Sequence, residues 1–386
     1  MSPTLDRLLR PGPRVVAGLM SGTSLDGADA VVARVEGTGA GLSVETLGFH
    51  SEPYGGPLRE ALAACVEAAT SDVRLVSQLH ARLGGVFADV AERALAEAGL
   101  GPGALDLVGS HGQTVHHVPE PEDCAGVPTR STLQIGSPAV LAVRLGAPVV
   151  ADFRAGDLAL GGQGAPLAPY LDRTLFASPD ETRVLLNLGG IANVTVLAPG
   201  REPVAFDTGP ANMVLDALVR RLAGQPYDRG GQIAAAGAPD GTLLARLVGD
   251  PYYALPPPKS TGREHFGSDF VDGLVASGLG TEDLVATATA LTARTVADAV
   301  RQHAPAAARV VASGGGVHNA TLLAMLADAL GPVPVETTAA YGVDPDAKEA
   351  VLFAVLAHEW ANGARTGLPS VTGAAGAAMQ GSLTLP

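Results

Sequence analysis

Two glycine-rich turns in this chain combine backbone N–H groups with short polar side chains. Residues 14–35 read RVVAGLMSGTSLDGADAVVARV, two apolar β-rich runs joined by a turn of Gly, Ser, Thr and Asp. Such a hairpin directs N–H groups and hydroxyls into one concavity, which suits a phosphate. A shorter version recurs at residues 183–197 as RVLLNLGGIANVTVL. Two such hairpins predict that a nucleotide phosphate is held from both sides, as in a kinase or ATPase.

The first turn carries the strongest local signal. Its hydroxyls on Ser21, Thr23 and Ser24 can donate hydrogen bonds to phosphate oxygens. Asp26 can hold a Mg²⁺-bound water, because magnesium prefers few carboxylates together with waters and phosphates. The alternative is an ordinary polar hairpin turn, which seldom collects so many donors between two strands that read as buried.

A candidate general base lies in the segment FDTGPAN, residues 206–212. Asp207 ends a predicted strand just before a predicted helix, where a carboxylate is well placed to deprotonate a nucleophile. Phosphoryl transfer needs little covalent catalysis by the protein. One general base, together with a cation that helps to position the phosphates, is therefore a sufficient catalytic set. The alternative, equally supported by the residues, is that Asp207 forms a turn and accepts backbone N–H groups.

Candidate substrate groups lie in a glycine-rich loop, DFRAGDLALGGQGAPLAP, at residues 152–169. Arg154, Asp157 and Gln163 suit the hydroxyl, amide and carboxylate groups of a sugar, and Arg154 could pair with a carboxylate in bidentate fashion. For Asp152 a structural ion pair with arginine is the favoured interpretation.

Four further features have both a functional and a structural interpretation. The glycines of ASGGGVHN (312–319) would let an adenosine lie against the backbone, although glycines between strand and helix are common. Lys259 lies in the loop PPPKSTGREHFG, either near substrate or in a solvated turn. For His111 and His116, which could assist the reaction, a structural role is the favoured interpretation. Glu349 starts a predicted helix, where its charge could simply interact with the helix N-terminus.

Composition and missing motifs exclude several classes of protein. The net charge is −14, from 25 basic and 39 acidic residues, and no cluster of basic residues favours a nucleic-acid or anionic-membrane partner. Cys65 and Cys124 lack metal-ligand spacing and indicate two reduced thiols. No secretory signal or membrane-spanning run is visible, which predicts a cytoplasmic protein. The motif G-x-x-x-x-G-K-[ST] is missing, so a P-loop nucleotide hydrolase is excluded.

The pattern of apolar residues predicts the elements that position these groups. Strands are predicted at 14–20, 28–36 and 42–50, then helices near 57–70 and 73–99, then short strands and a helix up to 153. The second half repeats this order: strands within 183–209, a helix at 212–222, a long irregular region, a helix at 283–303, a strand at 309–316, and helices near 319–330 and 346–362. We therefore predict two α/β domains, with the ligand in the cleft between them.

These segments, taken in order, closely resemble the 1,6-anhydro-N-acetylmuramic acid kinases. The matching segments are GLMSGTSLDGAD, SHGQT, QIGSPAVLA, DFRAGDLALGGQGAPLAP, LNLGGIANVT, FDTGPAN, PKSTGREHF and SGGGVHN. The resemblance implies two similar actin-like ATPase (ribonuclease H-like) domains with an inter-domain cleft: residues 1–153 plus 363–386, and residues 154–362. It also implies ATP, Mg²⁺ and an amino sugar as ligands. Family enzymes open the anhydro ring with water and phosphorylate O6, giving N-acetylmuramic acid 6-phosphate for the recycling of cell-wall (peptidoglycan) sugars.

The resemblance also implies roles for individual residues. Asp207 would be the base that activates water, and Glu349 a second acidic residue of less defined role. The residues implied for nucleotide binding are Gly22, Thr23, Ser24, Leu25, Asp26, Gly27, Ala28, Asp29, Asn187, Gly189, Gly190, Asn193, Gly314, Gly315 and Gly316, with Asp26 as the metal ligand. The residues assigned to substrate are His111, Gln113, Arg154, Asp157, Gln163 and Lys259. Ala211 stands where glycine is frequent in the family, and it should be tolerated if its φ is negative.

Three other functions stay open at this point. A kinase of the same superfamily could phosphorylate another sugar or a carboxylate without ring opening. A chaperone-like ATPase switch would need an appended partner-binding domain, for which the chain leaves no room. A catalytically inactive sensor would not require Asp207. We further expect a homodimer and no nucleic-acid or membrane partner.

Overall fold

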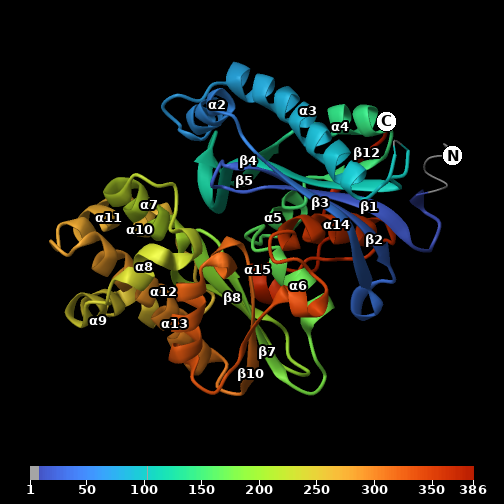
Figure 1. Cartoon of the computed structure of the whole chain (residues 1–386). Helices are drawn as coiled ribbons and strands as arrows, with labels where there is room; N and C mark the ends of the chain where they lie inside the picture. The colour runs from blue at the N-terminus through green and yellow to red at the C-terminus, as the bar shows by residue number, and fades with distance from the viewer. Residues whose placement is uncertain (1–7, 102) are drawn as a thin grey trace. The chain divides into compact units, whose positions relative to one another are not determined.

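The computed structural model describes residues 8–101 and 103–386, which form two compact units (Figure 1). Unit 1 comprises Met1–Leu175 and Ala347–Pro386, and unit 2 comprises Phe176–Asp346. The boundaries after residues 175 and 346 differ from those predicted after residues 153 and 362. Residues 1–7, part of the segment in which no secretory signal is visible, lie outside the described residues.

Unit 1 is built on a mixed β-sheet. Its strands are β1 (Arg14–Ser21), β2 (Gly27–Glu36), β3 (Ser43–Pro53), β4 (Leu107–Cys124), β5 (Val127–Ile135), β6 (Val149–Ala151) and β12 (Ser382–Thr384). Its α-helices are α2 (Gly56–Val66), α3 (Val73–Glu97), α4 (Pro138–Leu145), α5 (Ala155–Ala159), α6 (Ala168–Phe176), α14 (Lys348–Ala361) and α15 (Pro369–Thr372). The strand order is β12-β6-β4-β1-β2-β3, with β5 paired to β4. Strands β1, β2 and β3 are antiparallel, whereas β4 and β6 continue the sheet in parallel.

Helices α3 and α14 cover opposite faces of this sheet (Figure 1). Along β1, Ala17 and Leu19 point into the core beside α3, so Gly18 between them faces the other side. A Cβ on Gly18 would lie 2.0 Å from the carbonyl oxygen of Ala350, so only glycine lets α14 approach this closely. The packing of α14 on β1, β2 and β4 therefore places residues 347–362 in unit 1 rather than in the second domain, where the sequence placed them.

Two adjacent glycines of α3 should respond to alanine with opposite sign. A Cβ on Gly84 would lie 2.9 Å from both the Ser137 carbonyl oxygen and Val140 Cβ, whereas Gly85 has open space around it. We expect Gly84→Ala to destabilise the protein by about 1–3 kcal/mol through overpacking. Gly85→Ala should stabilise it by about 0.5–1 kcal/mol, because alanine loses less backbone entropy in a helix. Thermal unfolding of both variants tests the pair, and two shifts of the same sign would contradict the packing of α3 on α4.

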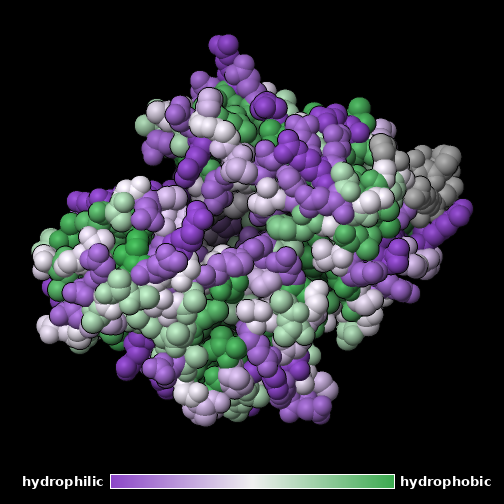
Figure 2. All heavy atoms as spheres, in the orientation of Figure 1, coloured by the Kyte–Doolittle hydropathy of each residue, from purple (hydrophilic) through white to green (hydrophobic). Residues whose placement is uncertain are grey.

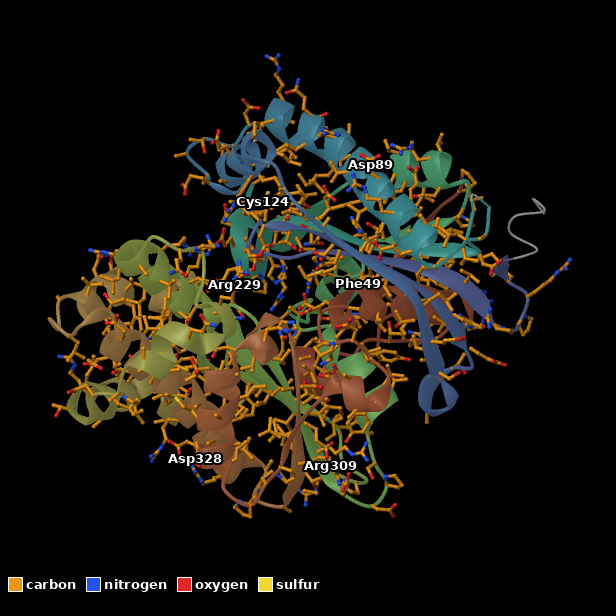
Figure 3. All side chains as sticks on the ribbon, viewed as in Figure 1. Phe49, Asp89, Cys124, Arg229, Arg309 and Asp328 are labelled. Carbon is orange, nitrogen blue, oxygen red and sulfur yellow. The ribbon has the colours of Figure 1, made fainter. Side chains whose placement is uncertain are left out.

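Strands β4 and β5 form a hairpin longer than the short strands predicted there. Most residues beyond His116 are exposed on both strands. Ala125 (φ 55°) and Gly126 (φ 83°) form the turn, beside the exposed Cys124 (Figure 3). Cys65 is buried, and both cysteines are free thiols, as expected.

Unit 2 repeats the sheet of unit 1. Its strands are β7 (Thr182–Leu188), β8 (Ile191–Leu197), β9 (Val204–Pro210), β10 (Ala307–Ser313) and β11 (Val335–Thr337). Their order, β9-β8-β7-β10-β11, corresponds to β3-β2-β1-β4-β6 in unit 1. In both units three antiparallel strands are followed by two parallel ones. The predicted fold class of two similar α/β domains is confirmed.

The helices of unit 2 form two hydrophobic clusters. They are α7 (Asn212–Ala223), α8 (Gln232–Ala236), α9 (Gly241–Val248), α10 (Arg263–Phe266), α11 (Ser268–Val275), α12 (Thr281–His303) and α13 (Ala320–Leu330). Helices α12 and α13 cover one face of the sheet, and a second cluster joins α7, α8, α9 and α11 to the first half of α12. The prediction of a long irregular region between 222 and 283 is therefore wrong. These helices are too short to show a clear 3.6-residue pattern, and tertiary packing stabilises them.

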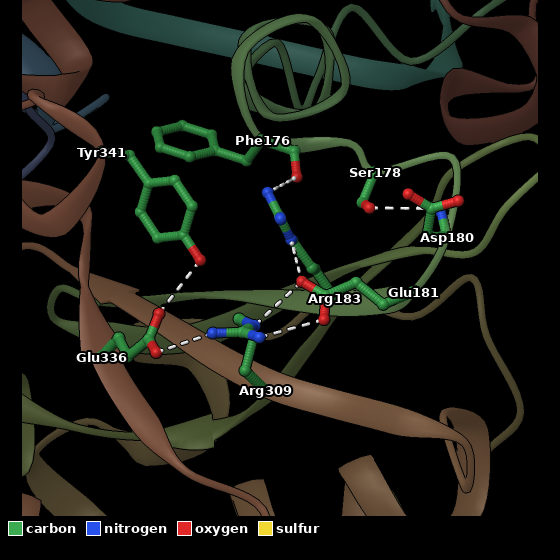
Figure 4. Close-up of polar contacts among 8 residues, drawn as sticks. All are labelled: Phe176, Ser178, Asp180, Glu181, Arg183, Arg309, Glu336 and Tyr341. Atoms are coloured by element: carbon green, nitrogen blue, oxygen red, sulfur yellow. Dashed lines mark hydrogen bonds and ion pairs between the residues drawn. The ribbon is translucent and has the colours of Figure 1, made fainter.

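An ionic network joins the parallel edge of the unit 2 sheet (Figure 4). Arg309 on β10 contacts Glu336 on β11 (2.8 Å) and Glu181 before β7 (2.9 Å), and Glu181 also accepts from Arg183 (2.7 Å). Tyr341 donates to Glu336 (3.0 Å). These partners lie on or just before the neighbouring strands β7, β10 and β11, so the network fixes this edge of the sheet. Strand β10, which leads to Gly314, lies next to the edge strand β11.

Among residues 8–101 and 103–386, every helix is too short or too polar to cross a bilayer. Over the face shown in Figure 2, hydrophilic and hydrophobic residues are interspersed.

Candidate active site

The first predicted phosphate loop is the tight turn between β1 and β2. Leu25 has a φ of 57°, and its buried side chain packs in the core of unit 1. This anchor leaves Thr23, Ser24 and Asp26 exposed at the surface of the turn. The Ser24 hydroxyl donates to Asp26 Oδ1 at 2.6 Å, so the two side chains are held together. The turn thus presents hydroxyls, backbone and one carboxylate to solvent.

Ser21 and Gln113 support this turn from inside the protein. The Ser21 hydroxyl lies 2.7 Å from Gln113 Oε1 and 2.8 Å from the Gly27 carbonyl oxygen, and Gln113 Nε2 donates to the Gly22 carbonyl at 3.0 Å. Gln113 has no exposed surface. In the structure as described, neither Ser21 nor Gln113 has a group free for a ligand, and both instead fix the shape of the turn.

His111 and Arg154 form a second polar group of unit 1. His111 Nδ1 lies 2.8 Å from the Gly112 carbonyl and must donate to it, so Nε2 accepts from Arg154 Nη2 at 2.9 Å. Burial, and then the charge of Arg154, lower the pKa of His111 to about 3, so the imidazole is neutral. Arg154 also donates to the Gly164 carbonyl at 2.8 Å and keeps partial exposure. His111 therefore orients the guanidinium, which retains surface for a ligand.

Asp157 organises the loop at 160–164 rather than facing outward. It is fully buried, accepts the Gly164 N–H at Oδ2 (2.8 Å) and accepts the Thr372 hydroxyl at Oδ1 (2.8 Å). Its neighbour Gln163 is exposed, with its N–H held by the Thr372 carbonyl at 3.0 Å. This segment, read from the sequence as a loop, also contains α5 and the start of α6.

A group of carboxylates surrounds the start of α14. Burial raises the pKa of Glu349, and the charges of Asp29 and Asp26 raise it further, against the lowering effect of Lys348 and Arg154. Lys348 is buried in an ion pair with Asp172 at 2.6 Å. Glu349 nevertheless keeps an exposed surface. Glu349 thus shares one electrostatic environment with the first phosphate turn, rather than being only a helix cap.

In unit 2, three predicted residues occupy one row across the sheet. Asn187 on β7 is paired with Asn193 on β8, and Asn193 is paired with Asp207 on β9. Directly paired residues project from the same face of a sheet. The residues before and after them along the strands, such as Leu186 and Leu188, point into the core on the opposite face. The row therefore aligns two amides and one carboxylate on the face away from α12.

The predicted adenosine loop packs on the second hairpin. Gly314 has a φ of 81°, and a Cβ there would lie 2.5 Å from Asn187 Oδ1. A Cβ on Gly316 would lie 2.5 Å from Leu188 Cβ. The structure therefore brings Gly314–Gly316 against Asn187 and Leu188.

The tip of the second hairpin is held by the start of α7. The carbonyls of Gly189 and Gly190 accept the N–H groups of Asn212 and Ala211, both at 3.0 Å. Asn212 Nδ2 also donates to the Leu188 carbonyl at 3.0 Å. The φ of Ala211 is −136°, so alanine is tolerated there as expected.

Asp207 lies in a partly buried position with few hydrogen bonds. Its Oδ2 accepts the Thr261 N–H at 2.9 Å, while Oδ1 accepts no hydrogen bond from residues 8–101 and 103–386. Burial raises the pKa of Asp207 to about 6, opposed by the Thr261 hydrogen bond and assisted by the charge of Glu264. A carboxylate with a pKa near neutrality and one free oxygen has the properties of a general base.

Lys259 does not present its ammonium to Asp207. Its Nζ donates to the carbonyls of Tyr252 (3.1 Å) and Tyr253 (3.0 Å) and lies over the Tyr252 ring. Only its backbone reaches Asp207, because the Lys259 carbonyl accepts the Asp207 N–H at 3.0 Å. The loop around Lys259 does approach the base, but through main-chain groups.

Three contributors to the environment of Asp207 were not predicted. Thr261 and Glu264 lie in the segment PKSTGREHF, in which Lys259 was the predicted site residue. The Tyr252 hydroxyl donates to the Asp207 carbonyl at 2.9 Å. The type of a residue does not indicate whether its backbone N–H or a charge at a distance acts on Asp207. The resemblance of the segment PKSTGREHF to the family was therefore the signal that pointed to this region.

Comparisons with known proteins show which family the chain belongs to. Residues 14–386 match the model of the family "Anhydro-N-acetylmuramic acid kinase". A protein of that name from Salinibacter ruber is 53% identical, covering 99% of this chain and 100% of the relative. One from Rhodococcus erythropolis is 47% identical, covering 96% and 94%. Among solved structures, an activator of 2-hydroxyisocaproyl-CoA dehydratase from Clostridium difficile with bound ADPNP aligns at a TM-score of 0.45 and 13% identity, over 90% of this chain and 96% of that one. The chain belongs to the anhydro-N-acetylmuramic acid kinase family.

Proposed function

We propose that this protein is an ATP-dependent kinase that opens 1,6-anhydro-N-acetylmuramic acid with water and phosphorylates O6. The products are N-acetylmuramic acid 6-phosphate and ADP, and the reaction serves the recycling of cell-wall sugars. Membership of the family supports the substrate and the phosphoryl transfer. The hydrolytic step is the chemistry that the family implies.

The observation that carries this proposal is the state of Asp207. The reaction requires a base that removes a proton from water as its oxygen attacks the anomeric carbon. Asp207 has a pKa raised to about 6 and a free Oδ1, so it is ionised at neutral pH and still basic enough to accept that proton. The O6 released from the ring is then the nucleophile toward the γ-phosphate.

We propose nucleotide-binding roles for one segment of unit 1 and two segments of unit 2. The Gly22–Asp29 turn and the Asn187–Asn193 hairpin would hold phosphates, and Gly314–Gly316 would accept the nucleoside. The fit is supported by the exposed hydroxyls of the first turn and by the absence of side chains along 314–316.

Magnesium fits the carboxylates of unit 1. The charges of Asp26 and Asp29 raise the pKa of Glu349, and a divalent cation would relieve this repulsion. Among the described residues no set of three or more His, Cys, Asp or Glu side chains is arranged to hold a metal. Mg²⁺ brings waters and phosphate oxygens of its own, so we propose Asp26 as one ligand, with charge neutralisation as its contribution.

On the substrate side, we propose that Arg154 and Gln163 contact the sugar. Both keep exposed surface, and a guanidinium suits the carboxylate of the lactyl group. His111, Gln113 and Asp157 would act as positioning residues, because their polar atoms already bind protein groups. Lys259 would not contact substrate through its ammonium.

Product analysis in ¹⁸O-labelled water tests the reaction. The anhydro sugar, N-acetylglucosamine and N-acetylmuramic acid are each incubated with the enzyme and ATP, and the masses of the products are measured by mass spectrometry. We expect a sugar phosphate only from the anhydro sugar, with ¹⁸O in its anomeric hydroxyl. Phosphorylation of the open sugars only would contradict the proposed substrate. Unlabelled product from the anhydro sugar would contradict the role of water.

The pH dependence should follow the ionisation of Asp207. Because the base must be ionised, kcat/KM should fall about tenfold per pH unit below pH 6. Glu264→Gln removes a negative charge that raises the pKa of Asp207, so this limb should move to lower pH. Steady-state rates between pH 4.5 and 8.5 measure both curves. A limb that stays in place in the variant would contradict the assigned environment.

Two further predictions concern the protein as a whole. We propose a homodimer and a cytoplasmic location. Light scattering of the purified protein measures its oligomeric state, and fractionation of cells measures its location.

A further inference from the structure

Unit 2 contains a small pocket that the proposed reaction does not use. Residues from β9, the 251–259 segment and α12 form it, among them Thr208, Tyr253, Lys259, Thr295, Asp298 and His303. Thr208 follows Asp207 on β9, so its side chain projects from the other face of the sheet. The pocket is therefore separate from the row of Asn187, Asn193 and Asp207.

Two hydrogen-bond donors at this pocket lack acceptors. Lys259 has three N–H groups, of which two donate to the carbonyls of Tyr252 and Tyr253. In the described part of the chain no acceptor is found for the third. The Tyr253 hydroxyl is buried, and it too has no partner among the described residues. A buried donor without an acceptor, such as the Tyr253 hydroxyl, is costly, and a ligand that accepts from it would remove that cost.

The charge of the pocket is positive. Asp298 is the carboxylate in its wall, and both its oxygens are occupied: Oδ2 by Arg294 (2.7 Å) and Oδ1 by Arg301 (2.6 Å). Burial, and then the charge of Lys259, lower the pKa of His303, so this imidazole is neutral at pH 7. The ammonium of Lys259 is thus a positive charge without a carboxylate partner in the pocket. The hydroxyls of Thr208 and Thr295 already donate to the carbonyls of Ala192 and Thr292, so the donors left for a ligand are the Lys259 ammonium and the Tyr253 hydroxyl.

We propose that this pocket binds a small oxyanion of the phosphate class, held by the Lys259 ammonium and the Tyr253 hydroxyl. Among the described residues, one Lys259 N–H and the Tyr253 hydroxyl have no acceptor, and a phosphate oxygen accepts hydrogen bonds from both types of donor. The occupant is inorganic phosphate or the phosphate group of a sugar phosphate.

The residues that bound the pocket also hold the backbone of Asp207. The Lys259 carbonyl accepts the Asp207 N–H, and the ring of Tyr252, which lies under the Lys259 ammonium, carries the hydroxyl that donates to the Asp207 carbonyl. An anion bound here also adds negative charge near the base. If Asp207 acts as proposed above, occupancy should raise the pH at which kcat/KM falls.

Acetylation of lysine tests the binding site directly, because the chain has only two lysines. The protein, with a non-hydrolysable ATP analogue filling the nucleotide site, is treated with N-hydroxysuccinimide acetate at increasing inorganic phosphate, and peptides are quantified by mass spectrometry. We expect phosphate to protect Lys259. Lys348 is buried in its ion pair with Asp172 and serves as the internal control, which should stay unmodified throughout. A parallel series with N-acetylglucosamine 6-phosphate, which has no amine to react with the reagent, identifies the source of the phosphate: the better ligand protects Lys259 at the lower concentration.

Tyr253→Phe is the decisive variant, since it removes one hydroxyl and keeps the ring. Loss of a hydrogen bond to a charged group should raise the half-protecting phosphate concentration about tenfold or more. The variant should also melt at a higher temperature without phosphate, because a buried unpaired hydroxyl is gone. Lys259 that labels equally with and without phosphate, or equal protection in the wild type and in Tyr253→Phe, would overturn the proposal. Labelling needs no turnover, so it is independent of whether the protein opens the anhydro ring.

Discussion

Asp207→Asn should lower kcat by about 10² to 10⁴-fold while leaving the affinity for ATP nearly unchanged. Asparagine has the same shape and can still accept the Thr261 N–H, so the local structure should persist. What it lacks is the ability to take a proton from water. Rates at saturating substrate and titration with a fluorescent ATP analogue give the two quantities. Turnover like that of the wild type would remove Asp207 from the mechanism.

The same variant should be more stable than the wild type above pH 6. Burial raises the pKa of Asp207 from 3.8 to about 6, so the folded protein binds this proton more tightly than the unfolded chain does. Ionisation therefore costs folding free energy, at most about 3 kcal/mol for a shift of two units. The cost is fully present above pH 6 and disappears as the pH falls toward 4.

Thermal unfolding at pH 8 and at pH 4.5 separates this effect from a change in packing. Asparagine mimics the protonated acid, so the variant should melt at a higher temperature than the wild type at pH 8, with little difference at pH 4.5. A variant less stable at both values would mean that the carboxylate has a structural rather than a catalytic role. The loss of activity together with gained stability is the expected signature of a functional residue in a strained environment.

The sequence predicted the two sheets well, because their strands carry strong local patterns. Strands β1 and β2 were located to within one residue, and the shared order of the two units follows from similar runs of apolar residues. Helices of eight residues or fewer between 232 and 275 were missed, since one or two turns show too little periodicity. The domain boundaries were misplaced for another reason. Helix α14 follows unit 2 in the chain, yet it packs on β1, β2 and β4 of unit 1, with the close contact at Gly18 as one example.

The sequence indicates which polar residue types are available for a site. It does not indicate which of these side chains are exposed and which already contact other parts of the protein. Exposed Thr23, Ser24 and Asp26 match the expectation of a ligand-facing turn. Gln113 and Asp157 have the same polar character in the sequence, yet the structure buries both and occupies their polar atoms. Residue type cannot distinguish a group that binds a ligand from one that holds a loop. That distinction depends on burial, which arises only when distant segments such as Thr372 and Gly164 come together.

Gly314→Ala should destabilise unit 2 and strongly weaken nucleotide binding. Gly314 has φ 81° and ψ 167°, a backbone conformation almost confined to glycine. The added Cβ would lie 2.5 Å from Asn187 Oδ1 and 3.1 Å from the backbone of Leu188. Backbone strain and the clash each cost about 1–3 kcal/mol, and relief would move Asn187, which heads the row that ends at Asp207.

Gly315→Ala is the matched control for folding, one residue along the same loop. Its φ is not in the left-handed region, and the nearest atom to its Cβ would be Asn212 Nδ2 at 3.9 Å, an ordinary contact. We therefore expect a melting temperature near that of the wild type for Gly315→Ala and a clear decrease for Gly314→Ala. Titration with the fluorescent ATP analogue should show a loss of affinity of 100-fold or more in Gly314→Ala, on the order of 3 kcal/mol. Equal behaviour of the two variants would mean that Gly314 does not pack on Asn187. The loop and the second hairpin would then have to be treated as independent elements rather than as one nucleotide-binding surface.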